Sequence, residues 1–477
     1  MNKGYFRYLF RSNRISLSFF AVLYALISFT SLISQNKFSF ALLSGYVMSL
    51  ILACVLPVYL FSWVHNRKRV DLFASLPYSR KNILFSSLAM AVLVPIVYFL
   101  VIGAVLSLMN RSHTLWPMYG TLIGHLIFYT VCIVLFHTAV YLIANNMLDG
   151  IILLVSYTLM PVLITYSVMF FLEAMSPLSF SGTADIYQFF PLPSAIMDAA
   201  RTGSRFASED YYVSTYSVSL LKILPAAILS AWSLIPDFIH RKMERAEQLS
   251  AGFFAYPFVI NVYAAGIMLA ICVSFHTDSN TVILILMALF AVYMIAQFIY
   301  RRSIRPTVKM ILNFVICLAA CACMTFITWK TECFHTADHI APRDRYLQFT
   351  YNGSIKENDG NNVSFSLLID RNDSDQKEVL DLLNSYTDEI TDAFYHSSQV
   401  QSNSYHDMTI NASNKNDDET MRTVYSCFAC GRLLSTDELE KISQYTDVTV
   451  DYYDESGNLQ QEIPLNQFLK ENKNEKS

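Results

Sequence analysis

The sequence has few charged residues for its length. Only 15% of its 477 residues are Asp, Glu, Lys or Arg, and 54% are hydrophobic, whereas about 25% of the residues in soluble domains are charged. This composition excludes a chain that folds in water alone. Residues 330–477 hold 27 of the 38 acidic and 13 of the 34 basic residues, which leaves 21 basic and 11 acidic residues in 1–329. We therefore expect a basic, apolar membrane domain over 1–329 and an acidic, polar domain over 330–477.

Several sequence patterns are absent, and their absence limits the classes of protein to which this chain can belong. No Gly-x-x-x-x-Gly-Lys-Ser/Thr segment is present, so the chain lacks the loop that cradles nucleotide phosphates in P-loop ATPases. No Asp or Glu lies well inside the long apolar runs, and Lys222 falls near the end of one. Proton- and sodium-coupled carriers place ionisable residues there, so this absence favours a transporter driven by ATP. His125 and His137 lie in the fourth run, where they either line a pathway or are neutral histidines bonded between helices.

The runs also lack any constellation of His, Asp, Glu or Ser that suggests a nucleophile and its base. We therefore expect no enzymatic activity and no catalytic residue in this chain.

Nine apolar runs are long enough to cross about 30 Å of hydrocarbon. They predict helices near 15–34, 41–64, 83–109, 118–143, 150–172, 218–236, 256–275, 282–300 and 310–329. The N-terminus and every second loop carry sixteen Lys or Arg, against four in the remaining loops. By the positive-inside rule the N-terminus is cytoplasmic, and nine crossings place 330–477 outside the cell membrane. The 144–149 turn has no basic residue, so it is placed on the cytoplasmic side only because successive loops must alternate between the two sides.

The polar segments predict the remaining elements. The long external connection 173–217 mixes aromatic and turn-forming residues, which is typical of short helices in or dipping into the membrane interface. In the tail we expect two pairs of strands and two helices: strands at 346–351 with 363–369 and at 448–453 with 459–463, and helices at 375–394 and 436–445. The predicted fold is an α-helical polytopic membrane protein with a small C-terminal α+β extracytoplasmic domain.

The basic loop 65–82 is the most informative segment. A helix that begins near Arg69 would place three apolar residues on one face: Leu72, Phe73 and Leu76. Pro77 would end this helix, and Ser79 could cap the next membrane helix. The pattern predicts a short amphipathic helix on the cytoplasmic surface, and a basic loop that only fixes topology is the alternative.

The segment Val70-Asp71-Leu72-Phe73-Ala74-Ser75-Leu76-Pro77-Tyr78-Ser79-Arg80 resembles the Asp…Ser-Leu-Pro-x-Ser-Arg loop of type-2 ABC transporter permeases from Gram-positive bacteria. It lies between the second and third spans, as in that family, where the loop is a coupling helix that docks on the ATPase subunit. The resemblance implies six ATPase-coupling residues: Asp71, Leu72, Phe73, Leu76, Pro77 and Arg80.

A second segment supports the same family. His240-Arg241-Lys242-Met243-Glu244-Arg245-Ala246-Glu247, followed by Phe253-Phe254-Ala255-Tyr256-Pro257, is similar to the basic Arg-Lys-x-Glu-x-Ala segment and the aromatic-Pro helix start of these permeases. The chain departs from the family's minimum of six helices. Its three additional helices and outside tail resemble a Gram-positive subgroup whose C-terminal domain has no assigned role.

The resemblance implies the membrane subunit of an ATP-driven exporter for an apolar or amphipathic substrate such as a drug or peptide. Its expected partners are a separate ABC ATP-binding subunit, a second copy or a related permease, and the lipid bilayer, with no nucleic acid. ATP binds the partner, so we expect no cofactor on this chain, and its substrate-binding residues are not predicted. The alternative function is an envelope-ligand sensor that signals through a partner kinase.

Two small groups in the tail carry weaker hypotheses. His335 and His339 are spaced to point at one metal ion from a helix, and a polar linker next to the membrane is the alternative. Cys427 and Cys430 have the spacing of a thioredoxin-like site, and a local disulfide or two idle thiols are the alternatives.

Overall fold

The structure is a computed structural model of the whole chain. It describes residues 3–35, 38–109, 115–176, 186–207, 217–242, 244, 246–248, 250, 252–273, 279–305, 307–335, 345–355, 358–373, 376–385, 406–413, 422–428, 435–453 and 459–465. The chain divides into two compact units. One unit consists of Met1–Thr165, Ile186–Ala264 and Val292–Met310, and the other of Tyr166–Asp185, Ala265–Ala291 and Ile311–Ser477.

Residues 3–335 are helical over most of their described part. Their elements are α1 (Lys3–Ser12), α2 (Arg14–Gln35), α3 (Phe38–Phe61), η1 (Ser62–His65), α4 (Arg67–Ala74), α5 (Arg80–Met109), α6 (Leu115–Ile143), α7 (Met147–Met175), η2 (Ile186–Phe189), α8 (Pro191–Ala207), α9 (Ser217–Ile239), α10 (Tyr256–Val273), α11 (Ser279–Arg301), α12 (Val308–Lys330) and α13 (Glu332–His335). Within the described residues, nine of these helices are long and apolar enough to cross a membrane, and they match the nine predicted runs to within a few residues. The prediction of nine helices of spanning length is confirmed.

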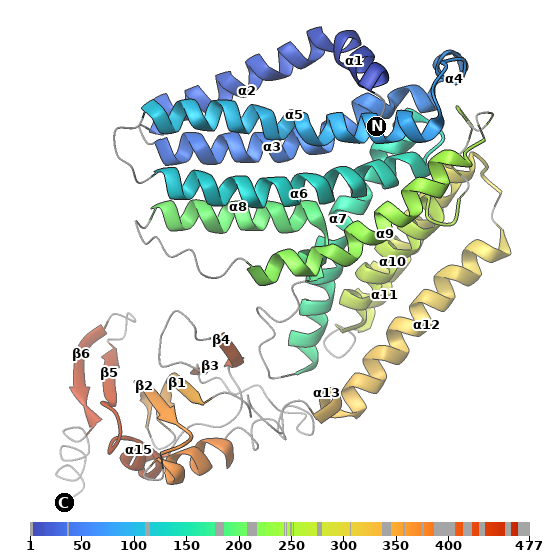
Figure 1. Cartoon of the computed structure of the whole chain (residues 1–477). Helices are drawn as coiled ribbons and strands as arrows, with labels where there is room; N and C mark the ends of the chain where they lie inside the picture. The colour runs from blue at the N-terminus through green and yellow to red at the C-terminus, as the bar shows by residue number, and fades with distance from the viewer. Residues whose placement is uncertain are drawn as a thin grey trace, which may run out of the picture. The chain divides into compact units, whose positions relative to one another are not determined.

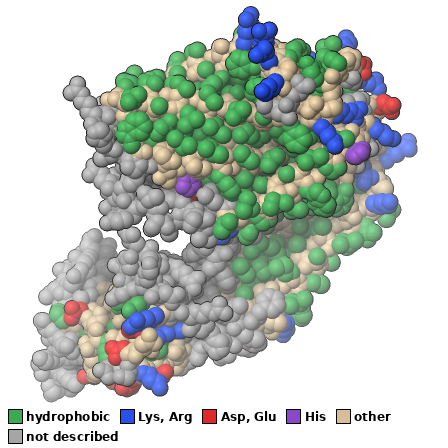
Figure 2. Space-filling view, viewed as in Figure 1, with side chains coloured by type: hydrophobic (Ala, Val, Ile, Leu, Met, Phe, Trp, Pro, Cys, Tyr) green, Lys and Arg blue, Asp and Glu red, His purple; other side chains and the backbone are tan. Residues whose placement is uncertain are grey.

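In the first unit, α3 lies at the centre of the bundle. It contacts α2, α5, α6 and α8, which run beside it in Figure 1. The helices α2 and α3 approach each other closely at Gly45, whose carbonyl accepts a hydrogen bond of 2.6 Å from the Tyr24 hydroxyl. Hydrophobic side chains also cover the outer face of this bundle, as Figure 2 shows. Apolar residues on every side of a helix are the pattern of a membrane span.

The 173–217 connection contributes a packed helix to the first unit. Its described part contains η2 and the 17-residue α8, which packs against α3 and α6. Ala195 and Ala199 of α8 belong to the main hydrophobic core. Small residues at this spacing let a helix approach its neighbours closely, so α8 packs against the bundle. Its depth in a membrane stays a prediction.

The tail forms a six-stranded antiparallel sheet. Its strands are β1 (Tyr346–Ile355), β2 (Asn358–Asp370), β3 (His406–Ser413), β4 (Arg422–Phe428), β5 (Thr449–Tyr453) and β6 (Leu459–Pro464), in the order β4-β3-β1-β2-β5-β6. Alternate residues are buried, and Phe349 lies opposite Leu367 in the register. The two predicted strand pairs are confirmed, as are helices at 377–385 and in α15 (Thr436–Ile442). The sequence analysis missed β3 and β4.

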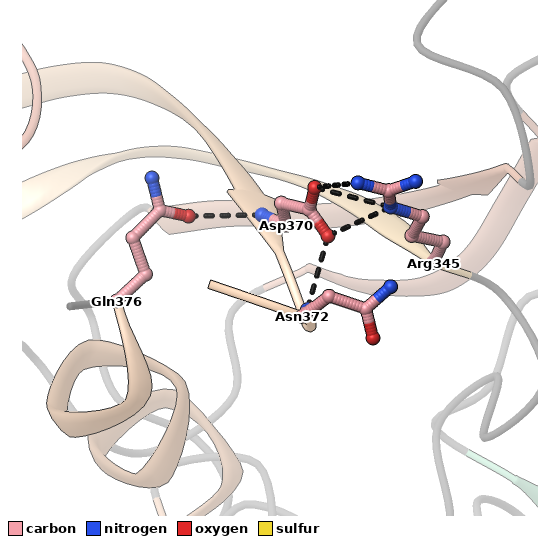
Figure 3. A network of polar contacts seen from close by, with 4 residues as sticks. All are labelled: Arg345, Asp370, Asn372 and Gln376. Atoms are coloured by element: carbon pink, nitrogen blue, oxygen red, sulfur yellow. Dashed lines mark hydrogen bonds and ion pairs between the residues drawn. The ribbon is translucent and has the colours of Figure 1, made fainter. Parts of the chain in front are cut away.

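An ion pair joins the ends of β1 and β2. The Arg345 guanidinium donates to both carboxylate oxygens of Asp370 at 2.7 to 3.1 Å, as drawn in Figure 3. The same carboxylate accepts from the Asn372 backbone amide at 3.0 Å, and the Gln376 side chain accepts from the Asp370 amide at 2.9 Å. The hydrogen bond from Arg345 lowers the pKa of the Asp370 carboxyl below its ordinary value.

Candidate functional site

The short helix predicted in the 65–82 loop is α4, at one end of the first unit. Its N-terminus is capped by Asn66, whose side-chain oxygen accepts from the Arg69 amide at 3.2 Å. The helix therefore begins two residues earlier than predicted. The Ser79 hydroxyl accepts from the Asn82 amide at 3.3 Å at the start of α5, as the sequence predicted.

The three apolar residues assigned to one face of α4 do not share that face. Leu72 is 61% exposed, whereas the Phe73 ring stacks on Trp63 with 4.3 Å between ring centroids. Phe73 follows the buried Val70 by three residues, which puts both on the inward face. The helix ends at Ala74, so Leu76 lies beyond it and packs against the core. The prediction that the three residues share one face of the helix is wrong, and Leu72 alone of the three points outward.

The other three residues of the predicted coupling loop also differ in their surroundings. Asp71 and Pro77 are exposed. Arg80 instead binds within the chain, because its Nη1 donates to the carbonyls of Ile239 at 2.8 Å and Arg241 at 3.0 Å. These carbonyls lie at the C-terminal end of α9, where a helix leaves acceptors unpaired and favours positive charge.

Arg241 makes the equivalent contact with the end of α6. Its guanidinium donates to the carbonyls of Leu142 and Ala144, the latter at 2.7 Å, and to Asn145 Oδ1 at 3.4 Å. The 144–149 turn, which has no basic residue of its own, therefore receives a positive charge from the basic segment after α9. It lies at the same end of the unit as α4 and this segment, as the alternation of loops predicted.

Glu247 connects the same three segments. Its amide donates to the Asn145 carbonyl at 2.8 Å, and its Oε1 accepts from the Arg67 amide at 3.3 Å. Its φ of 65° is left-handed, which is uncommon for a residue with a side chain. We call the contact among residues 66–80, 142–150 and 239–256 the three-loop joint.

A carboxylate completes the three-loop joint. The Ser250 hydroxyl accepts from the Asn145 amide at 2.9 Å and donates to Asp149 at 3.0 Å. The Tyr256 hydroxyl donates to the other Asp149 oxygen at 2.9 Å. The second sequence motif thus supplies structural contacts, from Arg241 through Tyr256, that the sequence alone did not reveal.

Positive charge gathers around the three-loop joint, as the Lys and Arg side chains in Figure 2 show. The exposed basic residues nearest α4 are Arg67, Lys68, Arg69 and Lys81. The surface of α4 therefore presents one apolar side chain, Leu72, and one carboxylate, Asp71, among basic groups. Such a surface can dock on a partner with a hydrophobic socket and acidic rim.

An apolar groove of about 590 Å³ runs between α3 and α8. Six of the residues that line it are Leu43, Val47 and Ile51 of α3 and Leu192, Ile196 and Ala200 of α8. Its volume and lining are typical of a site for a small apolar molecule.

A buried carboxylate lies in the bundle where the sequence predicted none. Asp198 of α8 accepts a hydrogen bond from the hydroxyl of Tyr129, which lies midway along α6. The Tyr129 and Ser194 hydroxyl oxygens are 3.3 Å apart. Sequence reasoning missed this site because α8 is too polar to resemble a span. The small residues Ala195 and Ala199 around Asp198 were the available signal.

The remaining predicted residues are only partly described. His335 lies in α13, whereas His339 and Cys430 fall outside the described residues, as does the Cys427 side chain. In the described part of the chain no three His, Cys, Asp or Glu residues are placed to hold a metal ion. His125 and His137 bond carbonyls of their own helix, those of Thr121 at 2.8 Å and Ile133 at 2.9 Å, rather than bridging helices through these nitrogens.

No protein-family model, curated protein or solved structure matches this chain. The residues of the three-loop joint and of α4 are therefore the features of this chain that indicate a function.

Proposed function

We propose that this chain is the membrane subunit of an ATP-driven ABC exporter and that α4 is the docking site for a separate ATPase subunit. The observation that carries the proposal is the division of α4 into two faces. Val70 and Phe73 fix the helix to the bundle, while Leu72 and Asp71 remain exposed. A rigid helix with a single exposed apolar residue is suited to transmit a push from a partner.

The three-loop joint provides a route for that push. Arg80 follows α4 and binds the end of α9, and Arg241 binds the end of α6. A displacement of α4 would therefore reach two long helices through short polar contacts. In this proposal Arg80 is a positioning residue within the chain, and Leu72 and Asp71 are the contacts to the ATPase.

The groove between α3 and α8 supports an apolar or amphipathic substrate. Its wall helix α8 packs against α6, whose end is bound by Arg241 in the three-loop joint. The proposed orientation has the N-terminus in the cytoplasm and residues 330–477 outside, as the distribution of basic residues favours.

The test is a pull-down of the detergent-solubilised full chain from its native host, with partners identified by mass spectrometry. Leu72→Asp should abolish recovery of an ABC ATPase without unfolding the protein, because Leu72 makes little contact with the core. Ile304→Asp is the matched control, since Ile304 is an 86% exposed apolar residue outside α4. Phe73 is unsuitable because it stacks on Trp63.

Recovery of an ABC ATPase at about stoichiometric level with the wild type and Ile304→Asp, and its loss with Leu72→Asp, would support the proposal. Recovery of no ATPase from the wild type would contradict it. Recovery of a kinase alone would favour the sensor.

A further inference from the structure

One stripe of α6 carries three buried polar side chains whose polar atoms have no hydrogen-bond partner among the described residues. They are Thr130 Oγ1, His137 Nε2 and the Tyr141 hydroxyl. The three residues are 0%, 1% and 0% exposed. Their spacing of seven and then four residues places them on one face of the helix, over a length of about 16 Å.

The neighbouring Thr138 shows how a buried threonine of α6 can satisfy its hydroxyl. The Thr138 hydroxyl donates to the Val134 carbonyl one turn earlier at 2.6 Å, whereas Thr130 makes no such bond. Because a carbonyl only accepts, the bond to Ile133 places the proton of neutral His137 on Nδ1. Its Nε2 is then a buried acceptor.

The stripe reaches the three-loop joint at Tyr141. There His65 of η1 packs edge-on against the Tyr141 ring, with 4.5 Å between centroids. The His65 ring is also buried, and its nitrogens have only poorly aligned contacts with the carbonyls of Tyr141 and Asn145. Four polar side chains therefore extend in a row from the middle of α6 to the three-loop joint.

Burying these polar groups without water would destabilise the folded protein. A buried polar atom without a partner gives up its hydrogen bonds to water and gains none in return, and native proteins contain few such atoms. Threonine, histidine and tyrosine side chains that share a helical stripe can be bridged by water, which both donates and accepts. If the stripe bound no water, Thr130, His137 and Tyr141 would each keep a buried polar atom without a partner among the described residues.

We propose that this stripe binds a file of ordered water molecules between Thr130 and His65, which makes this half of α6 a hydrated path inside the bundle. The ligand is water, held by the Thr130 and Tyr141 hydroxyls and by His137 Nε2. The proposal does not depend on the proposed export function, because it concerns only the interior of the helix bundle.

The test is X-ray hydroxyl-radical footprinting of the full chain in nanodiscs, read by mass spectrometry. Radicals form from water bound at a site, so Tyr141 should be oxidised severalfold faster than a dry tyrosine of equal burial. Tyr24 is the matched control, because it is fully buried and bonded to Gly45 and Ser49 within the protein. Equal, slow oxidation of Tyr141 and Tyr24 would overturn the proposal.

A pair of variants gives an independent readout. If the Tyr141 hydroxyl binds water, Tyr141→Phe should lower the Tm by about 2 °C, in the same direction as Tyr24→Phe. If the hydroxyl is dry, its removal relieves an unpaired buried group, and Tyr141→Phe should raise the Tm while Tyr24→Phe lowers it. A raised or unchanged Tm for Tyr141→Phe would contradict the water file.

Discussion

Arg241 and Arg345 each hold the end of a secondary structure element, but their surroundings and acceptors differ. Arg241 is partly buried and binds neutral carbonyls at the end of α6. Arg345 is exposed and binds the ionised carboxylate of Asp370 at the sheet. Exposed ion pairs are screened by water and salt and stabilise little. A partly buried arginine at a helix end donates hydrogen bonds to carbonyls that have no partner within the helix.

In this protein, the number of ion pairs is therefore a poor guide to the stability of a region. We expect the bidentate Arg345–Asp370 ion pair to contribute less to the free energy of unfolding than Arg241, which binds backbone carbonyls. The predictions below test that order, from the largest expected effect to the smallest.

Arg241→Ala should have the largest effect. It removes the donors for Leu142 and Ala144 at the end of α6 and should lower the free energy of unfolding by about 3 kcal/mol. Thermal unfolding of the full chain in detergent measures the loss. Lys242→Ala is the control, because Lys242 is the exposed basic neighbour. Equal effects of the two variants would show that net charge, not the helix contact, stabilises the three-loop joint.

Gly150→Ala tests the packing of the same region without changing charge. A Cβ at Gly150 would lie 2.6 Å from Cε2 of Tyr141, closer than real Cβ contacts. Moving the ring should cost about 2 kcal/mol. Gly252→Ala is the matched control, since its Cβ would meet nothing within 4 Å. A stable Gly150→Ala protein would mean that Tyr141 is not fixed against α7.

Glu247 allows backbone strain to be separated from its side-chain bond. At a φ of 65° alanine is strained and glycine is not, whereas both lose the carboxylate that accepts from Arg67. Glu247→Ala should therefore be less stable than Glu247→Gly by about 1 kcal/mol. Denaturant or thermal unfolding compares them. The reverse order would show that the left-handed conformation is not retained.

Arg345→Gln should have the smallest effect at neutral pH. The lowered pKa of Asp370 means that the ion pair contributes above the carboxyl's ordinary pKa. That contribution is lost as the pH falls through the lowered folded-state pKa, so wild type and variant should converge in acid. Hydrogen exchange of peptides covering β1 and β2 in the full chain, corrected for intrinsic rates, measures this. A difference that grows toward acid would contradict the assignment.

Much of the fold follows from the sequence because a long apolar run in water has few alternatives to a membrane helix. The nine helices were predicted for this reason, whereas the β1–β2 and β5–β6 pairs were predicted from short strand-like runs separated by turn residues. The strand β3 (406–413) was missed although its Met408, Ile410 and Ala412 alternate with polar residues, because the residues around it are mostly polar. The strand β4 (422–428) was missed because its polar and apolar residues do not alternate clearly. The pairing of β3 with β1 depends on contacts that are distant in sequence.

The candidate site was less predictable. Helical periodicity correctly placed a short helix before Pro77 but could not show that Phe73 meets Trp63. Nor could a basic motif show that Arg80 and Arg241 bind helix ends, because their acceptors are backbone carbonyls that any sequence supplies. Asp198 was missed because its helix enters the bundle through packing rather than through hydrophobicity.

The most direct measurement of the central claim is photo-crosslinking from position 72 in the native host. A photoreactive phenylalanine derivative at Leu72 should crosslink to an ABC ATPase subunit, and the same group at Ile304 should not. That result would identify α4 as the docking helix. Crosslinks from position 72 only to lipid, to a kinase, or to no protein would contradict the proposed function.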